Sequence, residues 1–330
     1  MVKINSFREV IALFSAGVLG IGVNIPENII TNEMIARRFG ITQEEICRKT
    51  GILERRYESP DSSLTDMCEI AGKRAIEDAG VNPKDIDMVI IGTNTHDTHI
   101  TAALVQDRIG AAHCAGLDLH SGCSSFITAL ATGAQFVQTG LYKNVLVIAV
   151  DKCSSLLNPM DKKTALLFSD GAAAVVLGQV DKSNGILGIH MQMDGSGGKY
   201  LHLDENKHIK MDGRAVFEFA VDRFPKAVHK VLELSGLSLQ EVDFIIPHQS
   251  NLRIIEAGTA RLGFPIEKVH TKTIQYYGNS SAPTIAIGLH EEVKEGKIKD
   301  GDVVVLAGYG AGLGWGAIVM RWGQTSKLLI

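Results

Sequence analysis

The chain of 330 residues carries one long pattern twice. In the first copy, a helical stretch ends at Gly80, an acidic turn follows, and an aliphatic strand is predicted at 88–91. In the second copy, the same order places a helix end at Gly236 and a strand at 244–246. Glycine just after a helix supplies the left-handed conformation that closes it. Solenoid repeats have periods of about 20–50 residues, so a repeat this long indicates two copies of a whole domain.

The repeat continues through a helix, a Gly-x-Ser-Ser turn leading into a second helix, and an aliphatic strand. The predicted ranges are 100–110, 125–140 and 145–150 in the first copy and 252–263, 282–296 and 303–308 in the second. The turns begin at Gly122 and Gly278, 156 positions apart. Helices alternating with apolar strands predict an α/β fold with a mostly parallel sheet in each half. The turn-rich stretch 181–185 separates the halves, which we place at 1–181 and 182–330 and expect to pack about a pseudo-two-fold axis.

Composition excludes several classes of protein. The formal net charge is −4 and 45% of the residues are hydrophobic, which excludes an intrinsically disordered chain. No run is rich in Lys and Arg, so we expect no nucleic-acid partner. No apolar run approaches the roughly 20 residues of a spanning helix, so we expect no membrane insertion. The five scattered cysteines favour a reducing compartment, and we predict a cytoplasmic protein.

Two segments need separate interpretation. Residues 10–23 form an apolar run after Lys3 and Arg8 and are similar to a signal-peptide core. Glu9 abuts this run and no clear small-x-small cleavage site follows it, so we interpret it as a buried first strand. Residues 190–212 are rich in Gly, His, Lys and Asp and are predicted to form a loop.

The two copies differ in reactive residues at equivalent positions. Cys123 occupies the position that Asn279 occupies in the second copy. His248 stands where the first copy has Thr93. Because ligands of open α/β sheets bind at the carboxyl ends of strands, we expect Cys123, His248 and Asn279 to converge on one cleft.

Cys123 precedes a predicted helix, and the positive end of a helix dipole favours the thiolate form. A thiolate in this place is a nucleophile toward an acyl carbonyl. The alternative is a small buried side chain that packs beneath the helix, as free cysteines often do. The position of Cys123 opposite Asn279 favours the nucleophile.

His248 lies in a polar run that follows a buried strand, where it can donate a hydrogen bond or move a proton near neutral pH. The alternative is a helix-cap role, which Ser250 also fits. Asn279 offers N–H donors and does not titrate, which suits the binding of an oxyanion or enolate. Its alternative is an ordinary turn residue.

The segment 308–316 holds five glycines in nine residues. A dinucleotide-binding fingerprint is excluded because residues 317–322 are predicted to form a strand, whereas that motif opens a helix. We interpret the segment as a loop whose backbone N–H groups face a substrate. A second tight turn covers 168–171, where we predict a structural role for Asp170.

Histidines and cysteines crowd the stretch 96–123, which raises a zinc site as an alternative. The residues are His96, His99, His113, Cys114, His120 and Cys123. Zinc sites prefer paired ligands at short regular spacing, as in His96–His99 and His120–Cys123. These two pairs fall in different elements of the repeat, so we expect no metal.

At these motifs, the sequence resembles the 3-oxoacyl-acyl-carrier-protein synthase III family of the thiolase fold. The resemblance spans about residues 16–322. The most specific motifs are 122–126, 247–253 and 277–282, with 50–56, 168–171 and the glycine-rich end also matching.

The resemblance implies a five-layered αβαβα fold built from two duplicated halves, and a homodimer. It implies that Cys123 takes an acyl group from a thioester, usually acyl-CoA, and condenses it with a malonyl unit on acyl carrier protein as CO2 leaves. His248 and Asn279 resemble the pair that holds the enolate oxygen. Backbone N–H groups of Cys123 and Ala311 would form a second oxyanion hole. No metal or redox cofactor is implied.

Several positions depart from the family pattern. The usual glycine of the oxyanion loop is Ala311, where a left-handed backbone would be strained. A Trp and an Arg that grip the adenine of CoA in many members are here Glu45 and Lys49, which weakens adenine binding. The aromatic residue that caps the acyl pocket across the dimer aligns with Thr98. A basic residue near the CoA phosphates is Lys162.

Lys49, Lys162 and Arg253 are the candidates for the pantetheine entrance and carrier docking, and Thr98 for the acyl pocket. The departures favour a specialised member that takes acyl groups from a carrier protein. We expect a condensing enzyme of fatty-acid or polyketide-like biosynthesis. An acyltransferase that passes the acyl group to an oxygen or nitrogen nucleophile is the main alternative. A non-catalytic partner subunit and a zinc hydrolase are the others.

Overall fold

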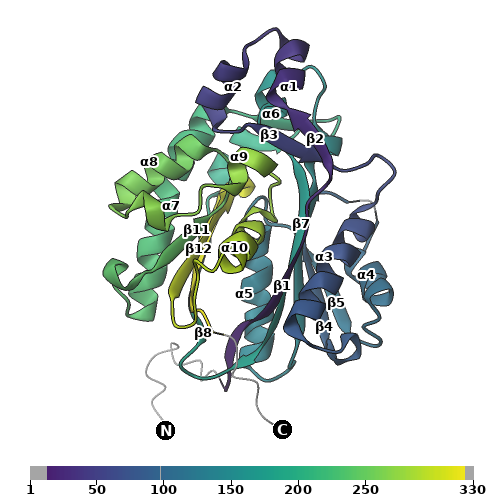
Figure 1. Cartoon of the computed structure of the whole chain (residues 1–330), viewed down its shortest axis with the longest axis vertical. Helices are drawn as coiled ribbons and strands as arrows, with labels where there is room; N and C mark the ends of the chain where they lie inside the picture. The colour runs from purple at the N-terminus through teal and green to yellow at the C-terminus, as the bar shows by residue number, and fades with distance from the viewer. Residues whose placement is uncertain (1–12, 97, 324–330) are drawn as a thin grey trace.

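The computed structural model describes residues 13–96 and 98–323. They form five layers in which helices and sheets alternate (Figure 1). Two helices, α5 (Ser125–Gln138) and α10 (Thr284–Lys294), lie in the central layer between the two sheets. Their apolar side chains and the inner faces of both sheets make the largest hydrophobic core. The αβαβα fold expected from the sequence is confirmed.

The first sheet has the strand order β1-β7-β6-β4-β5. Its strands are β1 (Ser15–Asn24), β4 (Met88–Gly92), β5 (Ala115–Leu119), β6 (Val145–Lys152) and β7 (Asp170–Val180). Strand β4 runs parallel to β5 and β6, whereas β7 runs antiparallel to β1 and β6. Helices α3 (Leu64–Ala79) and α4 (Thr101–Ile109) cover the outer face of this sheet.

The second sheet has the order β11-β12-β13-β8, and only β11 and β12 are parallel. Its strands are β8 (Gly185–Met193), β11 (Phe244–Pro247), β12 (Val303–Gly310) and β13 (Gly314–Arg321). Helices α7 (Gly213–Ser235) and α8 (Leu252–Leu262) cover its outer face. The prediction of mostly parallel sheets is therefore wrong. A strand buried on both faces is a continuous apolar run whichever way it points, so its sequence does not reveal its direction.

The duplication is visible in the strand pairing. Strands β4 and β6 of the first sheet correspond to β11 and β12 of the second, and α4 corresponds to α8. The counterpart of β5 is reduced to one bridge between Ile245 and Val269. The turn 181–184 joins β7 of the first sheet to β8 of the second, and it includes the predicted boundary between the halves.

Smaller elements complete the structure. A cap at one end of the layers contains β2 (Asn28–Thr31), β3 (Glu54–Tyr57), α1 (Asn32–Phe39), α2 (Gln43–Thr50), α6 (Lys162–Ala165) and α9 (Thr273–Tyr277). A separate two-stranded hairpin consists of β9 (Leu201–Leu203) and β10 (Ile209–Met211). Short 3₁₀ turns cover Pro83–Asp85, Cys153–Leu156, Gly195–Tyr200, Leu239–Glu241, Ile266–Lys268 and Ala311–Leu313.

Two segment predictions have different outcomes. The predicted loop at 190–212 is wrong, because the segment contains the end of β8 and the whole hairpin β9–β10. The first strand is found at β1, while residues 10–12 of the predicted run lie outside the described residues. Among the described helices, none has the length and apolar character needed to cross a bilayer.

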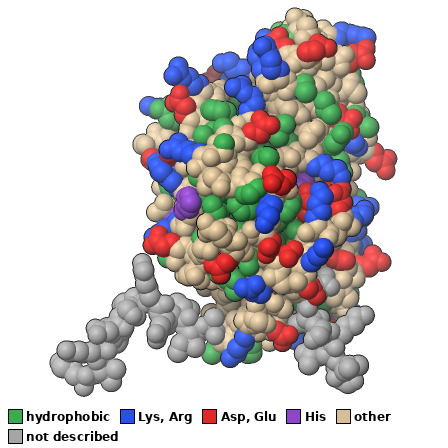
Figure 2. All heavy atoms as spheres, turned by 60° about the vertical axis from the view of Figure 1, so that its left-hand side comes forward, with side chains coloured by type: hydrophobic (Ala, Val, Ile, Leu, Met, Phe, Trp, Pro, Cys, Tyr) green, Lys and Arg blue, Asp and Glu red, His purple; other side chains and the backbone are tan. Residues whose placement is uncertain are grey.

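The surface carries charges of both signs. On the face shown in Figure 2, Lys and Arg side chains lie among Asp and Glu side chains, with hydrophobic side chains exposed between them. This mixture agrees with the small formal net charge of −4.

Candidate active site

Cys123 lies where the chain turns into α5, just before the N-cap residue Ser124. Gly122 makes this turn with φ of +59°, and a Cβ there would lie 2.8 Å from the backbone nitrogen of Ala311. A Cβ at Gly310 would lie 2.7 Å from the backbone nitrogen of Cys123. The two glycines therefore allow the end of β12 and the cysteine turn to pack backbone against backbone.

The Cys123 thiol is buried beside hydrogen-bond donors. Burial raises its pKa to about 11, and the Ser281 hydroxyl and the N–H groups of Ala311 and Cys123 act in the opposite direction. The Ser281 Oγ donates to Cys123 Sγ across 3.4 Å. The helix start is expected to favour a thiolate, whereas desolvation of the charge acts on the pKa of this thiol more strongly than these donors do.

His248 directly follows β11, and its backbone N–H donates to the carbonyl of Ala307 in β12. The side chain is buried, and its Nδ1 lies 2.6 Å from Thr284 Oγ1. Burial lowers the pKa of His248 to about 3, so the ring is neutral at physiological pH. A neutral imidazole has one N–H donor and one acceptor nitrogen.

Asn279 lies between α9 and α10 and is also buried. Its Oδ1 accepts a hydrogen bond of 2.9 Å from the backbone N–H of Ser281, so the amide nitrogen is the end available to a ligand. Its backbone N–H donates to the carbonyl of Leu167, and its carbonyl accepts from the N–H of Ser169. The segment 167–169 therefore fixes the position of Asn279.

Arg55 supports the same loop from the cap. Its side chain is fully buried and donates to Asn32 Oδ1 over 2.8 Å and to the carbonyl of Leu166 over 2.6 Å. A Cβ at Gly278 would lie 2.9 Å from the Cβ of Arg55. The motif 50–56, which carries part of the family resemblance, thus contributes to the position of Asn279 through packing.

Asp170 has the structural role expected of it. Its carboxylate accepts hydrogen bonds from the backbone N–H groups of Glu58 and Ser154 and from the Ser154 hydroxyl, at 2.6–2.8 Å. Burial raises the pKa of Asp170 to about 6. The side chain thereby ties the residues after β3 and β6 to the start of β7.

Two cavities meet at Cys123. The larger, here called the apolar cavity, has a volume of about 300 Å³, and the smaller, called the narrow cavity, about 110 Å³. Cys123, Phe168 and Leu201 line both cavities. The narrow cavity also contains His248 and Asn279. The structure thus brings the three predicted reactive side chains to one place, with the thiol at the junction of two spaces.

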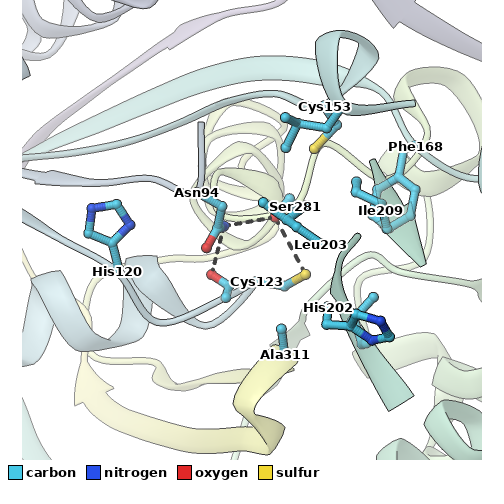
Figure 3. Close-up of a pocket in the computed structure, with 13 residues that line it drawn as sticks. Asn94, His120, Cys123, Cys153, Phe168, His202, Leu203, Ile209, Ser281 and Ala311 are labelled. Atoms are coloured by element: carbon cyan, nitrogen blue, oxygen red, sulfur yellow. Dashed lines mark hydrogen bonds between the residues drawn. The ribbon is translucent and has the colours of Figure 1, made fainter. Parts of the chain in front are cut away.

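The hairpin β9–β10 forms part of the wall of both cavities. Leu203, Ile209 and His202 line the apolar cavity (Figure 3), and Met211 lines the narrow one. Sequence reasoning missed these residues because it predicts a loop at 190–212. Strands of three residues are too short to show a clear alternation of apolar and polar side chains.

A polar network beside the thiol was also missed. Asn94 Nδ2 lies within hydrogen-bond distance of the Gly122 carbonyl at 3.0 Å and of Ser281 Oγ at 3.3 Å (Figure 3). The same nitrogen lies 2.9 Å from Asp151 Oδ2. Burial raises the pKa of Asp151. Ser281 has a left-handed backbone with φ of +65°, and its place in a Gly-x-Ser-Ser turn was the one available signal.

A second cysteine, Cys153, points into the apolar cavity from the 3₁₀ turn that follows β6 (Figure 3). It is buried, and burial raises its pKa well above the ordinary value of a thiol. Nothing in its sequence surroundings distinguishes it from a core residue.

The predicted entrance residues Lys49 and Lys162 line neither cavity. The Lys49 ammonium lies 2.6 Å from the Glu45 carboxylate, and it is the main cause of the lowered pKa of Glu45, to which Lys162 also contributes. The backbone carbonyl of Lys49 accepts from Asn251, which does line the narrow cavity. Lys49 is therefore hydrogen-bonded through its backbone to a residue that lines that cavity, and its ammonium group is paired with Glu45.

The remaining predicted residues fall in different places. The Arg253 guanidinium stacks 5.7 Å from the ring centroid of Phe217, a residue of the narrow cavity. Thr98, half-buried before α4, lines neither cavity of this chain.

Ala311 lines the apolar cavity, and its φ is not positive; Gly312 carries the φ of +130° instead. The strain expected of an alanine here does not arise.

Within residues 13–96 and 98–323, no three or more His, Cys, Asp or Glu side chains form a group suited to a metal ion. Two of the histidines considered for zinc do meet, with His96 Nε2 lying 3.0 Å from His120 Nδ1. His120 also lines the apolar cavity.

Comparison with known proteins agrees with the geometry. The family "3-Oxoacyl-[acyl-carrier-protein (ACP)] synthase III" matches residues 117–195, and its C-terminal part matches residues 232–322. A beta-ketoacyl-[acyl-carrier-protein] synthase III of Listeria welshimeri is 46% identical over 312 residues, covering 94% of this chain and 100% of the relative.

Two solved structures extend the comparison. The 3-oxoacyl-[acyl-carrier-protein] synthase III of Aquifex aeolicus superposes with a TM-score of 0.91 at 39% identity, covering 93% of this chain and all of that one. The priming beta-ketosynthase of the R1128 polyketide pathway gives a TM-score of 0.89 at 32% identity, with coverage of 94% and 97%. The sequence match over nearly the whole length, together with the thiol, imidazole and amide around one cavity, shows that this chain is an enzyme of the 3-oxoacyl-[acyl-carrier-protein] synthase III family.

Proposed function

We propose that this enzyme loads an acyl group onto Cys123 and condenses it with malonyl-carrier protein, with loss of CO2, to give a 3-oxoacyl thioester. The observation that carries the proposal is the narrow cavity, which places His248 and Asn279 beside the thiol of Cys123. A pair of neutral donors next to a nucleophile suits a reaction that forms an enolate. The family membership supports the same chemistry.

The first step is transfer of the acyl group. Cys123 sulfur bonds to the thioester carbonyl carbon, the donor carbon–sulfur bond breaks, and the thiol proton ends on the departing donor sulfur. In the tetrahedral intermediate, the former carbonyl oxygen carries a negative charge. The backbone N–H groups of Cys123 and Ala311 are directed at the Cys123 sulfur, next to the position of that oxygen. The apolar cavity is the space that receives the acyl chain.

The second step forms the carbon–carbon bond. The malonyl thioester enters the narrow cavity, its bond to the carboxylate breaks, and CO2 leaves. The electron pair becomes an enolate, whose oxygen accepts hydrogen bonds from His248 and Asn279. The enolate carbon then attacks the acyl carbonyl, and the bond to Cys123 sulfur breaks. The sulfur leaves as a thiolate, which takes a proton from water to restore the thiol. Neutral donors stabilise the enolate without protonating its carbon.

We also propose a carrier protein as the acyl donor. The position expected to stack on the CoA adenine carries Glu45, whose carboxylate is paired with Lys49 over 2.6 Å. An ion pair gives neither a stacking surface nor a free positive charge for CoA phosphates. Faster acylation by acetyl-CoA than by acyl-carrier protein would contradict this part.

Further parts of the proposal remain predictions. The chemistry uses the enzyme's own side chains and backbone N–H groups, so it calls for no metal or redox cofactor.

We propose a homodimer formed along β5, which is an edge strand of the first sheet and lies near the exposed Ile100 and Leu104. Sedimentation of the purified chain tests this. A cytoplasmic location follows from the cysteine pattern alone.

Intact-protein mass spectrometry tests the acyl-enzyme. The wild type is mixed with a panel of acyl-CoA and acyl-carrier-protein thioesters, beside Cys123→Ala and a control, Cys47→Ala, which alters an exposed cysteine. We expect an acyl adduct on the wild type and the control but none on Cys123→Ala. Absence of an adduct with every donor would overturn the proposal. Discharge of the adduct to an alcohol or amine without CO2 release would favour the alternative acyltransferase.

A further inference from the structure

Within the part of the chain that the structure describes, the His248 imidazole has one hydrogen-bond partner, and its other nitrogen can serve the substrate. Its Nδ1 lies 2.6 Å from the Oγ1 of Thr284, the first residue of α10. The ring also lines the narrow cavity with Asn279. A neutral imidazole carries one proton on its two nitrogens. Whether Nε2 offers a proton or a lone pair to a substrate therefore depends on whether Nδ1 is protonated.

The two neutral tautomers of this ring do opposite things. With the proton on Nε2, the ring donates a hydrogen bond to an oxygen in the narrow cavity. With the proton on Nδ1, Nε2 presents a lone pair, which repels the negative oxygen of an enolate. Burial lowers the pKa of His248 to about 3, so the ring is neutral at physiological pH and carries a proton on only one of its nitrogens.

The hydrogen bonds around Thr284 decide between these tautomers. The hydroxyl has a single proton, and two acceptors are within reach, namely His248 Nδ1 at 2.6 Å and the Ser281 carbonyl at 3.0 Å. The Ser281 carbonyl already accepts from the backbone N–H of Thr284, although over a long 3.4 Å. The Gln249 backbone N–H points at Thr284 Oγ1 over 3.3 Å and occupies one of its lone pairs.

We propose that Thr284 is a positioning residue that donates its hydroxyl proton to Nδ1 of His248, fixes the Nε2–H tautomer, and so makes the ring a donor to the enolate oxygen. The contact with Nδ1 is the shorter of the two contacts open to the hydroxyl proton, and the Ser281 carbonyl keeps the backbone N–H of Thr284 as a donor when the hydroxyl turns to Nδ1. The Gln249 N–H supports it, because a hydroxyl that already accepts one hydrogen bond is the better donor in the next. The inference rests on the proposed function, whose second step needs that donor.

Nitrogen NMR of the resting enzyme tests the tautomer directly. Long-range ¹H–¹⁵N correlation on protein labelled in histidine distinguishes protonated from unprotonated ring nitrogens, and His248→Gln identifies the signal. We expect Nε2 to be protonated in the wild type and in Thr284→Ser, which keeps the hydroxyl. We expect a mixture or the Nδ1–H form in Thr284→Val. An Nδ1–H ring in the wild type would overturn the proposal, whatever reaction the enzyme catalyses.

Kinetics separate a positioning role from a structural one. In Thr284→Val, we expect decarboxylation of malonyl-carrier protein to fall roughly tenfold or more, because the fraction of donor tautomer falls. Acylation of Cys123 should stay within about twofold, and Thr284→Ser should restore decarboxylation. Equal loss of both steps would count against the proposal.

A matched control removes a buried hydroxyl elsewhere. Thr259 in α8 is buried like Thr284, and its Oγ1 has no hydrogen-bond partner among the described residues. Thr259→Val should change neither the tautomer nor the ratio of the two rates. If Cys123 accepts no acyl group from any donor, the proposed function fails, while the NMR result still decides the role of Thr284. If Thr284→Val does not fold, the wild type and Thr284→Ser carry the test.

Discussion

Burial acts in opposite directions on two central side chains. It raises the pKa of the Cys123 thiol to about 11 and lowers the pKa of His248 to about 3. Both shifts favour the neutral form, because a low-dielectric site penalises charge of either sign. Across the physiological range, the resting site therefore holds a thiol beside a neutral imidazole. We therefore expect the thiolate to form as the acyl donor is attacked rather than beforehand.

This protonation state predicts the pH dependence of alkylation. Far below its pKa, the thiolate fraction of Cys123 rises about tenfold per pH unit. We expect alkylation by iodoacetamide in the ligand-free enzyme to increase steadily from pH 7 to pH 9.5. Peptide mass spectrometry follows Cys123, with the exposed Cys47 as an internal reference. A plateau of the Cys123 rate below pH 8.5 would show a thiol with an ordinary or lowered pKa.

Two small residues facing each other at the thiol should respond differently to substitution. Gly122→Ala places a Cβ 2.8 Å from the nitrogen of Ala311 at a left-handed φ, so it displaces the N–H group that we propose as an oxyanion-hole donor. We expect acylation to fall at least about tenfold. Ala311→Gly leaves the N–H in place and should change acylation less than about threefold. Quenching the acylation reaction at timed intervals and measuring the intact-protein mass gives the acylation rate of each variant. Equal loss of rate in the two variants would contradict the geometry.

At the scale of elements, the side chains proposed as catalytic lie at the ends of strands and in the turns that lead into the central helices. Sequence reasoning found these because the two copies differ at Cys123, His248 and Asn279 within an otherwise matching order. It missed the hairpin β9–β10, since three-residue strands carry no readable periodicity. It also missed Cys153 and Asn94, which are ordinary residues in sequence and become part of the site through folding alone.

The cap of the molecule contributes stability to the Asn279 loop through Arg55. Arg55→Met removes a buried cation and leaves Asn32 Oδ1 and the Leu166 carbonyl without their donor. We expect the free energy of unfolding to fall by about 2–3 kcal/mol. Arg37→Met, which breaks an exposed pair with Glu33, should cost no more than about 0.5 kcal/mol. Urea denaturation compares them, and similar losses would mean that Arg55 is not structurally central.

The apolar cavity predicts a preference in acyl chain length. Cys153→Phe fills part of a space of about 300 Å³ without touching the narrow cavity. We expect acylation by donors of roughly eight carbons to fall at least about tenfold, while acetyl transfer stays within about threefold. Competition between acyl-carrier proteins of different length measures the ratio. Equal loss for short and long donors would show that the acyl chain lies elsewhere.

At the scale of the whole molecule, duplication explains what could be predicted. Matching halves revealed the order of helices and strands, the cleft between them and the residues at which the copies differ. Strand direction was predicted wrongly, because β1 and β7 are apolar on both faces and look like parallel strands. The entrance residues were the least predictable part, since surface charges such as Lys49 and Arg253 follow no periodicity and pair locally.

The central claim is that acylation of Cys123 and decarboxylation belong to one condensation. Single-turnover reaction of acyl-enzyme with malonyl-carrier protein labelled in its free carboxyl group measures both at once. The account predicts one CO2 released for each acyl group that leaves Cys123, at equal rates, with a 3-oxoacyl-carrier protein as product. His248→Ala should slow the discharge about a hundredfold and leave the acyl adduct intact. Discharge of the acyl group without labelled CO2 would contradict the account.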